Sequence, residues 1–147
     1  MRHLILACSL ALTALLAQAE VIDIDHAEFD RLVKNGIPVV DIRTQAEWED
    51  GGIVRGSELL TFFDERGKAD PAAWLEKVGP IAKPNQPVIL ICRSGNRTKA
   101  ASQFLSEQGG YAKVYNVKGG IKGWVKEGGV LVPANQSIAA CRDAKTC

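Results

Sequence analysis

The sequence predicts an α/β domain in which helices cover both faces of a mainly parallel sheet. Short apolar segments rich in β-branched residues alternate along the chain with segments of helical periodicity, which is typical of this class. Capping residues and glycine pairs mark where the helical segments begin and end. The 147 residues, of which 46% are hydrophobic and 24% charged, are enough for one domain with a substantial core.

Capping boxes predict the two helices in the first part of the chain. In a capping box, the side chain at the helix start and a carboxylate three residues later each accept a hydrogen bond from the other's backbone N–H. Asp25 with Glu28 and Thr44 with Glu47 have this spacing. Glycines end both helices, and the expected strands around them are 21–24, 37–42 and 59–60.

The second part of the chain alternates in the same way. Asp70-Pro71 is typical of a helix start, because proline suits the first helical position, and Gly79-Pro80 ends that helix. The run 87–92 is the most strand-like in the chain and is short enough to be a buried strand. The remaining elements are a helix over 97–108, a strand over 112–117 and a helix over 119–126.

The first nineteen residues have the pattern of a secretory signal peptide. Met1-Arg2-His3 is basic, an uncharged and mostly apolar run follows over 4–17, and Ala17-Gln18-Ala19 supplies small residues at a cleavage point. A membrane anchor is the alternative, but a span needs about 20 apolar residues and this run is shorter. We therefore expect a periplasmic or secreted protein, with no membrane contact after cleavage. Its parts would be the signal peptide 1–19, a folded domain 20–132 and a loosely held tail 133–147.

Charge and histidine content limit the chemistry of the chain. Lys and Arg number 18 against 17 Asp and Glu, a net charge of +1 that argues against nucleic acid as a partner. After cleavage His26 would be the one remaining histidine, so we expect neither a His-rich metal site nor a cofactor. His26 follows Asp25 at a helix start, where a solvated side chain is expected rather than a catalytic one. A nucleophile in this chain must therefore be activated without imidazole.

Cys92 is the candidate nucleophile. It closes the strand 87–92, and ligands of α/β sheets bind at the carboxyl ends of strands. The backbone N–H groups of the next five residues can point inward and, with the helix dipole, stabilise a thiolate. These candidate substrate-binding residues are Arg93, Ser94, Gly95, Asn96 and Arg97. The alternative is that Cys92 is a small buried apolar residue, although the two arginines then have no evident role.

At these positions the chain resembles the rhodanese (sulfurtransferase) family. The loop 92–97 is similar to that family's six-residue active loop. Residues 40–43 look like its strand ending in Asp-x-Arg, and 47–57 resemble its E-[FW]-x-x-G-H-I-x-G-[AS] segment. Residues 114–124 are close to its V-x-N-x-x-G-G-x-x-x-W signature, so the resemblance covers about 21–127. Gly52 stands where the family usually has histidine, and we expect some loss of local rigidity there but no loss of chemistry.

The resemblance implies a single rhodanese-like domain that transfers sulfane sulfur. The Cys92 thiolate would attack the outer sulfur of thiosulfate or a similar anionic donor, and the persulfide would pass its sulfur to cyanide or to a thiol. Such two-step covalent catalysis predicts ping-pong kinetics. Arg93 and Arg97 would attract the sulfonate of the donor, and the acceptor thiol could belong to another protein. Asp41 and Arg43 would support the fold, with Glu47 near enough in sequence to pair with Arg43.

Three alternatives stay open at this point. A Cdc25-like phosphatase or arsenate reductase uses Cys-x5-Arg, whereas four residues separate Cys92 from Arg97, which gives a tighter ring. The same cysteine could also serve a persulfide carrier or interaction module that does not turn over. Cys141 and Cys147 could form a disulfide in the tail, which we favour, or one of them could resolve a Cys92 persulfide.

Overall fold

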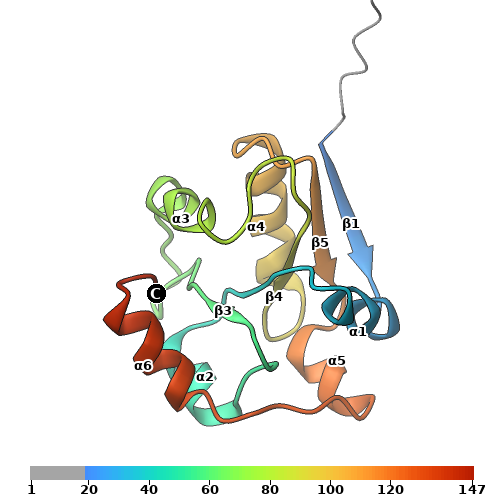
Figure 1. The fold of residues 1–147 in the computed structure, drawn as a ribbon, viewed down its shortest axis with the longest axis vertical. Coiled ribbons are helices and arrows are strands. Elements are labelled where there is room, and N and C mark those ends of the chain that lie inside the picture. The colour runs from blue at the N-terminus through green and yellow to red at the C-terminus, as the bar shows by residue number, and fades with distance from the viewer. Residues whose placement is uncertain (1–18) are drawn as a thin grey trace, which may run out of the picture.

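Residues 19–147 are described in a computed structural model (Figure 1), so the predicted signal peptide lies outside the described residues apart from Ala19. Within this range the chain forms five strands and six helices, each near its predicted position except for the last helix. In chain order they are β1 (Glu20–Ile24), α1 (His26–Lys34), β2 (Val39–Asp41), α2 (Gln45–Gly51), β3 (Glu58–Leu59), α3 (Pro71–Val78), β4 (Val88–Ile91), α4 (Asn96–Glu107), β5 (Lys113–Val117), α5 (Gly120–Lys126) and α6 (Asn135–Asp143).

The strands form one sheet in the order β1-β5-β4-β2-β3, and every neighbouring pair is parallel. This confirms the α/β class predicted from the alternation of strands and helices. β4 lies in the middle of the sheet, and all four of its residues are buried. The residue that follows it, Cys92, is therefore at the centre of the carboxyl edge, where ligands of such sheets bind.

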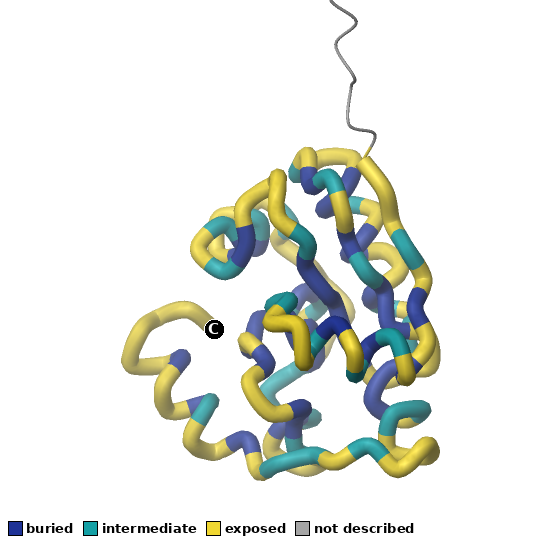
Figure 2. Tube along the Cα trace, turned by 45° about the vertical axis from the view of Figure 1, so that its right-hand side comes forward, coloured by how far each residue is buried: buried dark blue, intermediate teal, exposed yellow. Residues whose placement is uncertain are grey.

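Side chains of β4 point alternately into two cores. Val88, Leu90 and Cys92 belong to a core that α3 and α4 cover, through residues such as Trp74 and Leu105. The intervening residues of β4 belong to a second core, which α1 and α5 cover. Figure 2 shows the buried positions concentrated on the strands and on the inner sides of the helices. The predicted arrangement, with helices on both faces, is confirmed.

The segment 133–147 is not the loosely held tail that the sequence predicts. It contains α6, which lies beside α2 and carries its buried positions on one side (Figures 1 and 2). Ala134, Ile138 and Cys141 pack with Trp48 of α2 and two other residues in a third core. Few apolar residues and no side-chain cap mark this helix in the sequence, so it depends on packing rather than on local signals.

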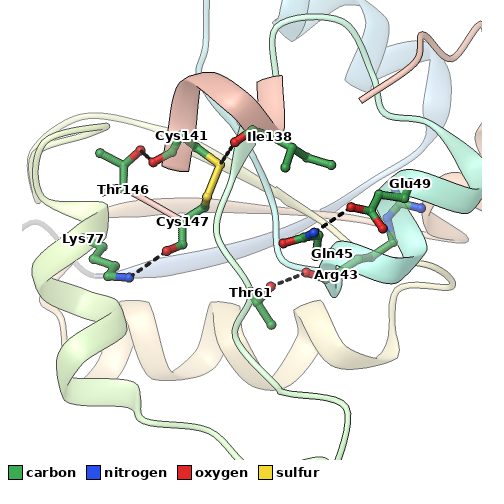
Figure 3. Close-up of a disulfide and its surroundings, with 9 residues drawn as sticks. All are labelled: Arg43, Gln45, Glu49, Thr61, Lys77, Ile138, Cys141, Thr146 and Cys147. Carbon is green, nitrogen blue, oxygen red and sulfur yellow. Dashed lines mark hydrogen bonds between the residues drawn. A yellow bond between two sulfur atoms is a disulfide. The ribbon is translucent and has the colours of Figure 1, made fainter. Parts of the chain in front are cut away.

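A disulfide joins Cys141 to Cys147, as favoured from the sequence (Figure 3). The Lys77 Nζ donates a hydrogen bond of 3.1 Å to the carbonyl of Cys147, which ties the end of the segment to α3. Among residues 19–147, no helix is long and apolar enough to cross a membrane.

Gly52 is the residue that lets the segment before α6 lie against α2. Its φ of +75° favours glycine, and a Cβ there would lie 2.7 Å from the carbonyl oxygen of Val132. The next residue, Ile53, exchanges backbone hydrogen bonds of 2.9 and 2.8 Å with Val132. The histidine that the resemblance suggests at this position would collide with that backbone. The absence of a side chain at position 52, where the family usually has histidine, therefore allows the C-terminal segment to pack at this place.

Candidate active site

Cys92 lies with its sulfur below the surface of the carboxyl edge. The residue is completely buried, and it is the free cysteine of the described range. Its Sγ accepts a hydrogen bond of 3.2 Å from the backbone N–H of Gly95 and lies 3.5 Å from the Thr98 hydroxyl. The Gly95 amide is one of the donors that the sequence predicts around the sulfur.

Of the five predicted substrate-binding residues, Arg93, Ser94 and Gly95 form the turn between Cys92 and α4, and Asn96 and Arg97 are the first two residues of that helix. Gly95 has a φ of +93° and precedes the first residue of α4, which explains why glycine is needed there. Arg93, Ser94 and Asn96 are exposed, whereas Gly95 and Arg97 are half-buried. The structure thus brings the predicted residues together around the start of α4, with Arg93 exposed and Arg97 bonded to Glu47 of α2.

The turn at 118–120 and the first residues of α5 contact the cysteine loop, backbone against backbone. The N–H groups of Ile121 and Lys122 donate to the carbonyls of Cys92 and Arg93 at 2.9 and 3.0 Å. A Cβ on Gly120 would lie 2.3 Å from the Cys92 carbonyl oxygen and 2.7 Å from the Arg93 carbonyl carbon. This contact explains the second glycine of the Gly-Gly pair in physical terms: any side chain there would occupy the space of the loop.

His26 is buried, so the prediction of a solvated side chain at the helix start is wrong. Its Nε2 lies 3.1 Å from the carbonyl oxygen of Gly120, and its Nδ1 lies 2.9 Å from a carboxylate oxygen of Glu127. Carbonyl and carboxylate oxygens accept hydrogen bonds, so each ring nitrogen of His26 faces an acceptor. A Cβ on Gly123 would lie 2.3 Å from the ring. His26 therefore packs against the turn at 118–120, and this turn contacts the backbone of the cysteine loop.

Asp41 and Arg43 form a buried ion pair at the end of β2. Both side chains are almost fully buried, and the Arg43 Nε and Nη2 donate to the Asp41 carboxylate at 2.7–3.1 Å. Arg43 also donates to the backbone carbonyls of Glu47 and Gly52, at 3.3 and 2.7 Å. These bonds join the sheet to both ends of α2, which is the supporting role that the resemblance implies.

The carboxylate of Glu47 pairs with Arg97, so the pairing with Arg43 that the sequence suggests is wrong. Both Nη atoms of Arg97 donate to it, at 2.7 and 2.6 Å, although the two residues are 50 positions apart. Glu47 also accepts from the backbone N–H of Thr44, which confirms the capping box. The pKa of Glu47 is lowered to about 2, mainly by the hydrogen bonds from Arg97. One of the two arginines expected to bind the donor is thus already neutralised.

A cavity of about 510 Å³ opens above the cysteine loop. Its walls come from the loop, from the start of α2 and from the segment between β3 and α3. The lining residues are Thr44, Ala46, Glu47, Asp64, Glu65, Arg93, Ser94 and Arg97. Asp64 and Glu65 were not expected from the sequence, because nothing local in residues 61–68 indicates that they reach the loop.

Replacing Glu47 with glutamine is expected to make the protein less sensitive to acid. Because the pKa of Glu47 is lower in the folded protein than its ordinary value of 4.5, its pairing stabilises the fold above pH 4.5. This contribution is lost as the pH falls from about 4.5 to about 2. Because the pair is partly exposed, we expect E47Q to lower the free energy of unfolding by about 1 kcal/mol at neutral pH. Between pH 4.5 and 2, the free energy of unfolding of E47Q should fall less than that of the wild type.

Denaturant unfolding of both proteins at a series of pH values measures this effect. Glu49→Gln removes a carboxylate from the exposed side of the same helix and serves as the control. An acid dependence of E47Q equal to that of the wild type would contradict the assignment.

Comparisons with known proteins agree with this geometry. A family model described as a rhodanese-like domain matches residues 25–127. Thiosulfate sulfurtransferase 18 of Arabidopsis thaliana is 31% identical over 112 residues, which are 72% of this chain and 79% of that protein. Thiosulfate sulfurtransferase GlpE of Actinobacillus pleuropneumoniae serotype 3 (strain JL03) is 49% identical over 43 residues, 29% of this chain and 39% of that protein.

Among solved structures, the crystal structure of a rhodanese-related protein from Thermoplasma volcanium superposes with a TM-score of 0.58 at 29% identity. The match covers 76% of this chain and 97% of that one. A parallel α/β domain with a cysteine loop at the end of its central strand is thus the class that the fold and the site define. The chain belongs to the rhodanese family. The matched residues end before α6, so the packed C-terminal segment lies outside the family match.

Proposed function

We propose that this protein is a sulfurtransferase that carries sulfane sulfur from thiosulfate or a similar donor to a thiol, through a persulfide on Cys92. The observation that carries the proposal is the position of this cysteine. It ends the central strand of a rhodanese domain, its sulfur accepts a hydrogen bond from Gly95, and a cavity that contains Arg93 lies above its loop. The names of the relatives support the same chemistry.

The reaction would proceed in two displacements at sulfur. In the first, the Cys92 thiolate attacks the outer sulfur of thiosulfate, the sulfur–sulfur bond of the donor breaks, and sulfite leaves with the electron pair. In the second, the thiolate of the acceptor attacks the outer sulfur of the persulfide, and Cys92 leaves as a thiolate. The acceptor gains the sulfur, and no external oxidant or reductant is consumed.

Backbone amides would stabilise the charge on sulfur in both steps. The Gly95 N–H faces the sulfur directly, and Arg93 is the exposed guanidinium of the loop. The proposal requires the loop 93–96 to open, since Cys92 is completely buried. Once formed, the persulfide places its outer sulfur one bond further from Cys92, toward the acceptor.

Mass spectrometry after exposure to thiosulfate tests this function. We expect the wild-type protein to gain about 32 Da, one sulfur atom, and the Cys92→Ser variant to gain nothing. Cys141 and Cys147 are joined in a disulfide, and sulfur taken up by Cys8 would also appear in the variant. A wild-type protein that gains no mass, or a variant that gains the same mass, would overturn the proposal.

The phosphatase alternative is not favoured by the arrangement around Arg97. A phosphatase of this type needs the loop arginine for the phosphate, but here Glu47 occupies both Nη atoms of that arginine. A carrier that forms the persulfide without turning over differs from the proposed enzyme only in the second step. Turnover with a small thiol supports the enzyme, and a persulfide that persists in the presence of thiols supports the carrier.

We further propose that the protein acts in the periplasm or outside the cell. The signal peptide pattern of residues 1–19 and the disulfide of the C-terminal segment both suit an oxidising compartment. An exported chain that begins at Glu20 is the expected product of expression with the full leader, and a chain that keeps residues 1–19 would contradict this.

A further inference from the structure

One peptide group links His26 to the backbone of the nucleophile. The carbonyl of Gly120 and the N–H of Ile121 belong to the same planar peptide bond, in which the two groups point in opposite directions. The carbonyl oxygen lies 3.1 Å from the Nε2 of His26, and the N–H donates a hydrogen bond of 2.9 Å to the carbonyl of Cys92. This peptide group therefore lies between His26 on one side and the Cys92 backbone on the other.

The hydrogen bonds from α5 set the direction of the peptide groups in the cysteine loop. The carbonyls of Cys92 and Arg93 accept at 2.9 and 3.0 Å from the first N–H groups of α5, those of Ile121 and Lys122. The N–H of a trans peptide points away from its carbonyl, so the N–H groups of Arg93 and Ser94 point away from α5. Backbone amides of this loop are expected to stabilise charge on sulfur, and their direction thus depends on where α5 begins.

The His26 ring has little freedom to move. The residue is buried, and its Nδ1 lies 2.9 Å from a carboxylate oxygen of Glu127, at the end of α5. A Cβ added to Gly119 would lie 3.2 Å from the Cε1 of the ring, and one added to Gly123 would lie 2.3 Å from it. Such close packing on two sides fixes the Nε2 relative to the carbonyl of Gly120.

We infer that His26 is a positioning residue for sulfur transfer, which acts on the cysteine loop through the peptide group between residues 120 and 121. The inference rests on the proposed function and concerns its first step, in which the Cys92 thiolate takes the outer sulfur of the donor and sulfite leaves. His26 does not touch the reacting atoms. It donates from Nε2 to the Gly120 carbonyl, which can only accept. Without this bond the peptide group is free to rotate, and the loop that it holds is displaced.

Two amide substitutions separate the hydrogen bond to Gly120 from the packing of the ring. Both His26→Gln and His26→Asn remove the imidazole ring. The longer glutamine side chain can place an N–H donor near the position of Nε2, whereas asparagine can place one only near Nδ1. Persulfide formation with saturating thiosulfate is followed by mass spectrometry. We expect His26→Gln to stay within about threefold of the wild-type rate and His26→Asn to be about tenfold slower than the wild type.

Leu32→Val is the control for a loss of stability without a loss of positioning. Leu32 is buried on the same helix, about 9 Å further along its axis than His26. We expect this variant to form the persulfide at the wild-type rate. Denaturant unfolding measures the stability of every variant, so that a rate that merely follows stability is recognised.

The amide proton of Ile121 provides a second readout, because this N–H donates to the Cys92 carbonyl. Its hydrogen exchange, measured by NMR without any substrate, should be about tenfold faster in His26→Asn than in His26→Gln. Equal exchange in the two variants would contradict a link through this peptide group.

Gly123→Ala tests the same contact with His26 retained. The new Cβ would meet the imidazole ring at 2.3 Å, so the ring must leave the Gly120 carbonyl to make room. Gly123 lies inside α5, where alanine is favourable for the helix, and the variant is therefore expected to fold. We expect it to form the persulfide about tenfold more slowly than the wild type.

The outcomes distinguish the inference from the function on which it rests. Equal rates for His26→Gln and His26→Asn, or a wild-type rate for Gly123→Ala, would overturn the inference while persulfide formation still supports a sulfurtransferase. If Leu32→Val is slowed as much as His26→Asn, His26 only stabilises the fold, and the inference is again wrong. A wild-type protein that never forms the persulfide would overturn the proposed function, and the inference with it.

Discussion

Replacing Gly120 with alanine is expected to slow persulfide formation by roughly a hundredfold and to destabilise the domain. The new Cβ would lie 2.3 Å from the Cys92 carbonyl oxygen and within 2.8 Å of two backbone atoms of Arg93. All three are backbone atoms, so no flexible side chain can move to make room. This collision and the cost of a φ of +54° for alanine are together expected to lower the free energy of unfolding by about 2–4 kcal/mol. A loop displaced by about 1 Å would slow sulfur transfer by roughly a hundredfold.

Gly36→Ala is the matched control for this substitution. Gly36 also has a positive φ, +80°, but a Cβ there would meet no atom within 4 Å. It therefore measures the backbone strain without the collision. The comparison uses denaturant unfolding for stability and the thiosulfate-dependent gain of mass for the site. If G120A forms the persulfide at the wild-type rate, the turn at 118–120 does not position the cysteine loop.

The elements that the sequence predicts correctly are those with local signals. Asp25 and Asp70 cap their helices with hydrogen bonds of 2.8 and 3.1 Å to backbone N–H groups three residues on. The strand 87–92 is recognisable because a central parallel strand is buried on both faces and is apolar throughout. Such patterns lie within a few residues, so one sequence is enough to read them. The fold class and the position of Cys92 followed from them.

The features that the sequence does not predict depend on contacts between distant residues. His26 looks like an ordinary first-turn residue until Gly120, 94 positions away, is placed against its ring. Glu47 has Arg43 as its nearest basic neighbour in sequence, but the fold brings it to Arg97. α6 lacks a capping side chain and is held by packing on Trp48. In each case the tertiary structure provides the partner, and the local sequence carries no sign of it.

Replacing Arg43 with alanine is expected to cause the largest loss of stability among substitutions of the charged side chains described here. It would leave the carboxylate of Asp41, which has no exposed surface, without a counter-charge, and it would remove donors from the carbonyls of Glu47 and Gly52. Breaking a buried pair by removing one partner typically costs about 3–5 kcal/mol. Denaturant unfolding at neutral pH measures this loss. Arg31→Ala, which removes an exposed partner of Glu28, is the control and should change little.

The double variant Asp41→Asn with Arg43→Met separates the two causes of that loss. It removes the unpaired buried charge but still lacks the hydrogen bonds from Arg43 to the end of the neighbouring helix. If buried charge dominates, the double variant is more stable than Arg43→Ala, because neither new side chain is ionised. If the two are equally unstable, the bonds to Glu47 and Gly52 are what matter, and Arg43 stabilises the fold mainly by joining β2 to α2. An Arg43→Ala protein as stable as the Arg31→Ala control would contradict both explanations.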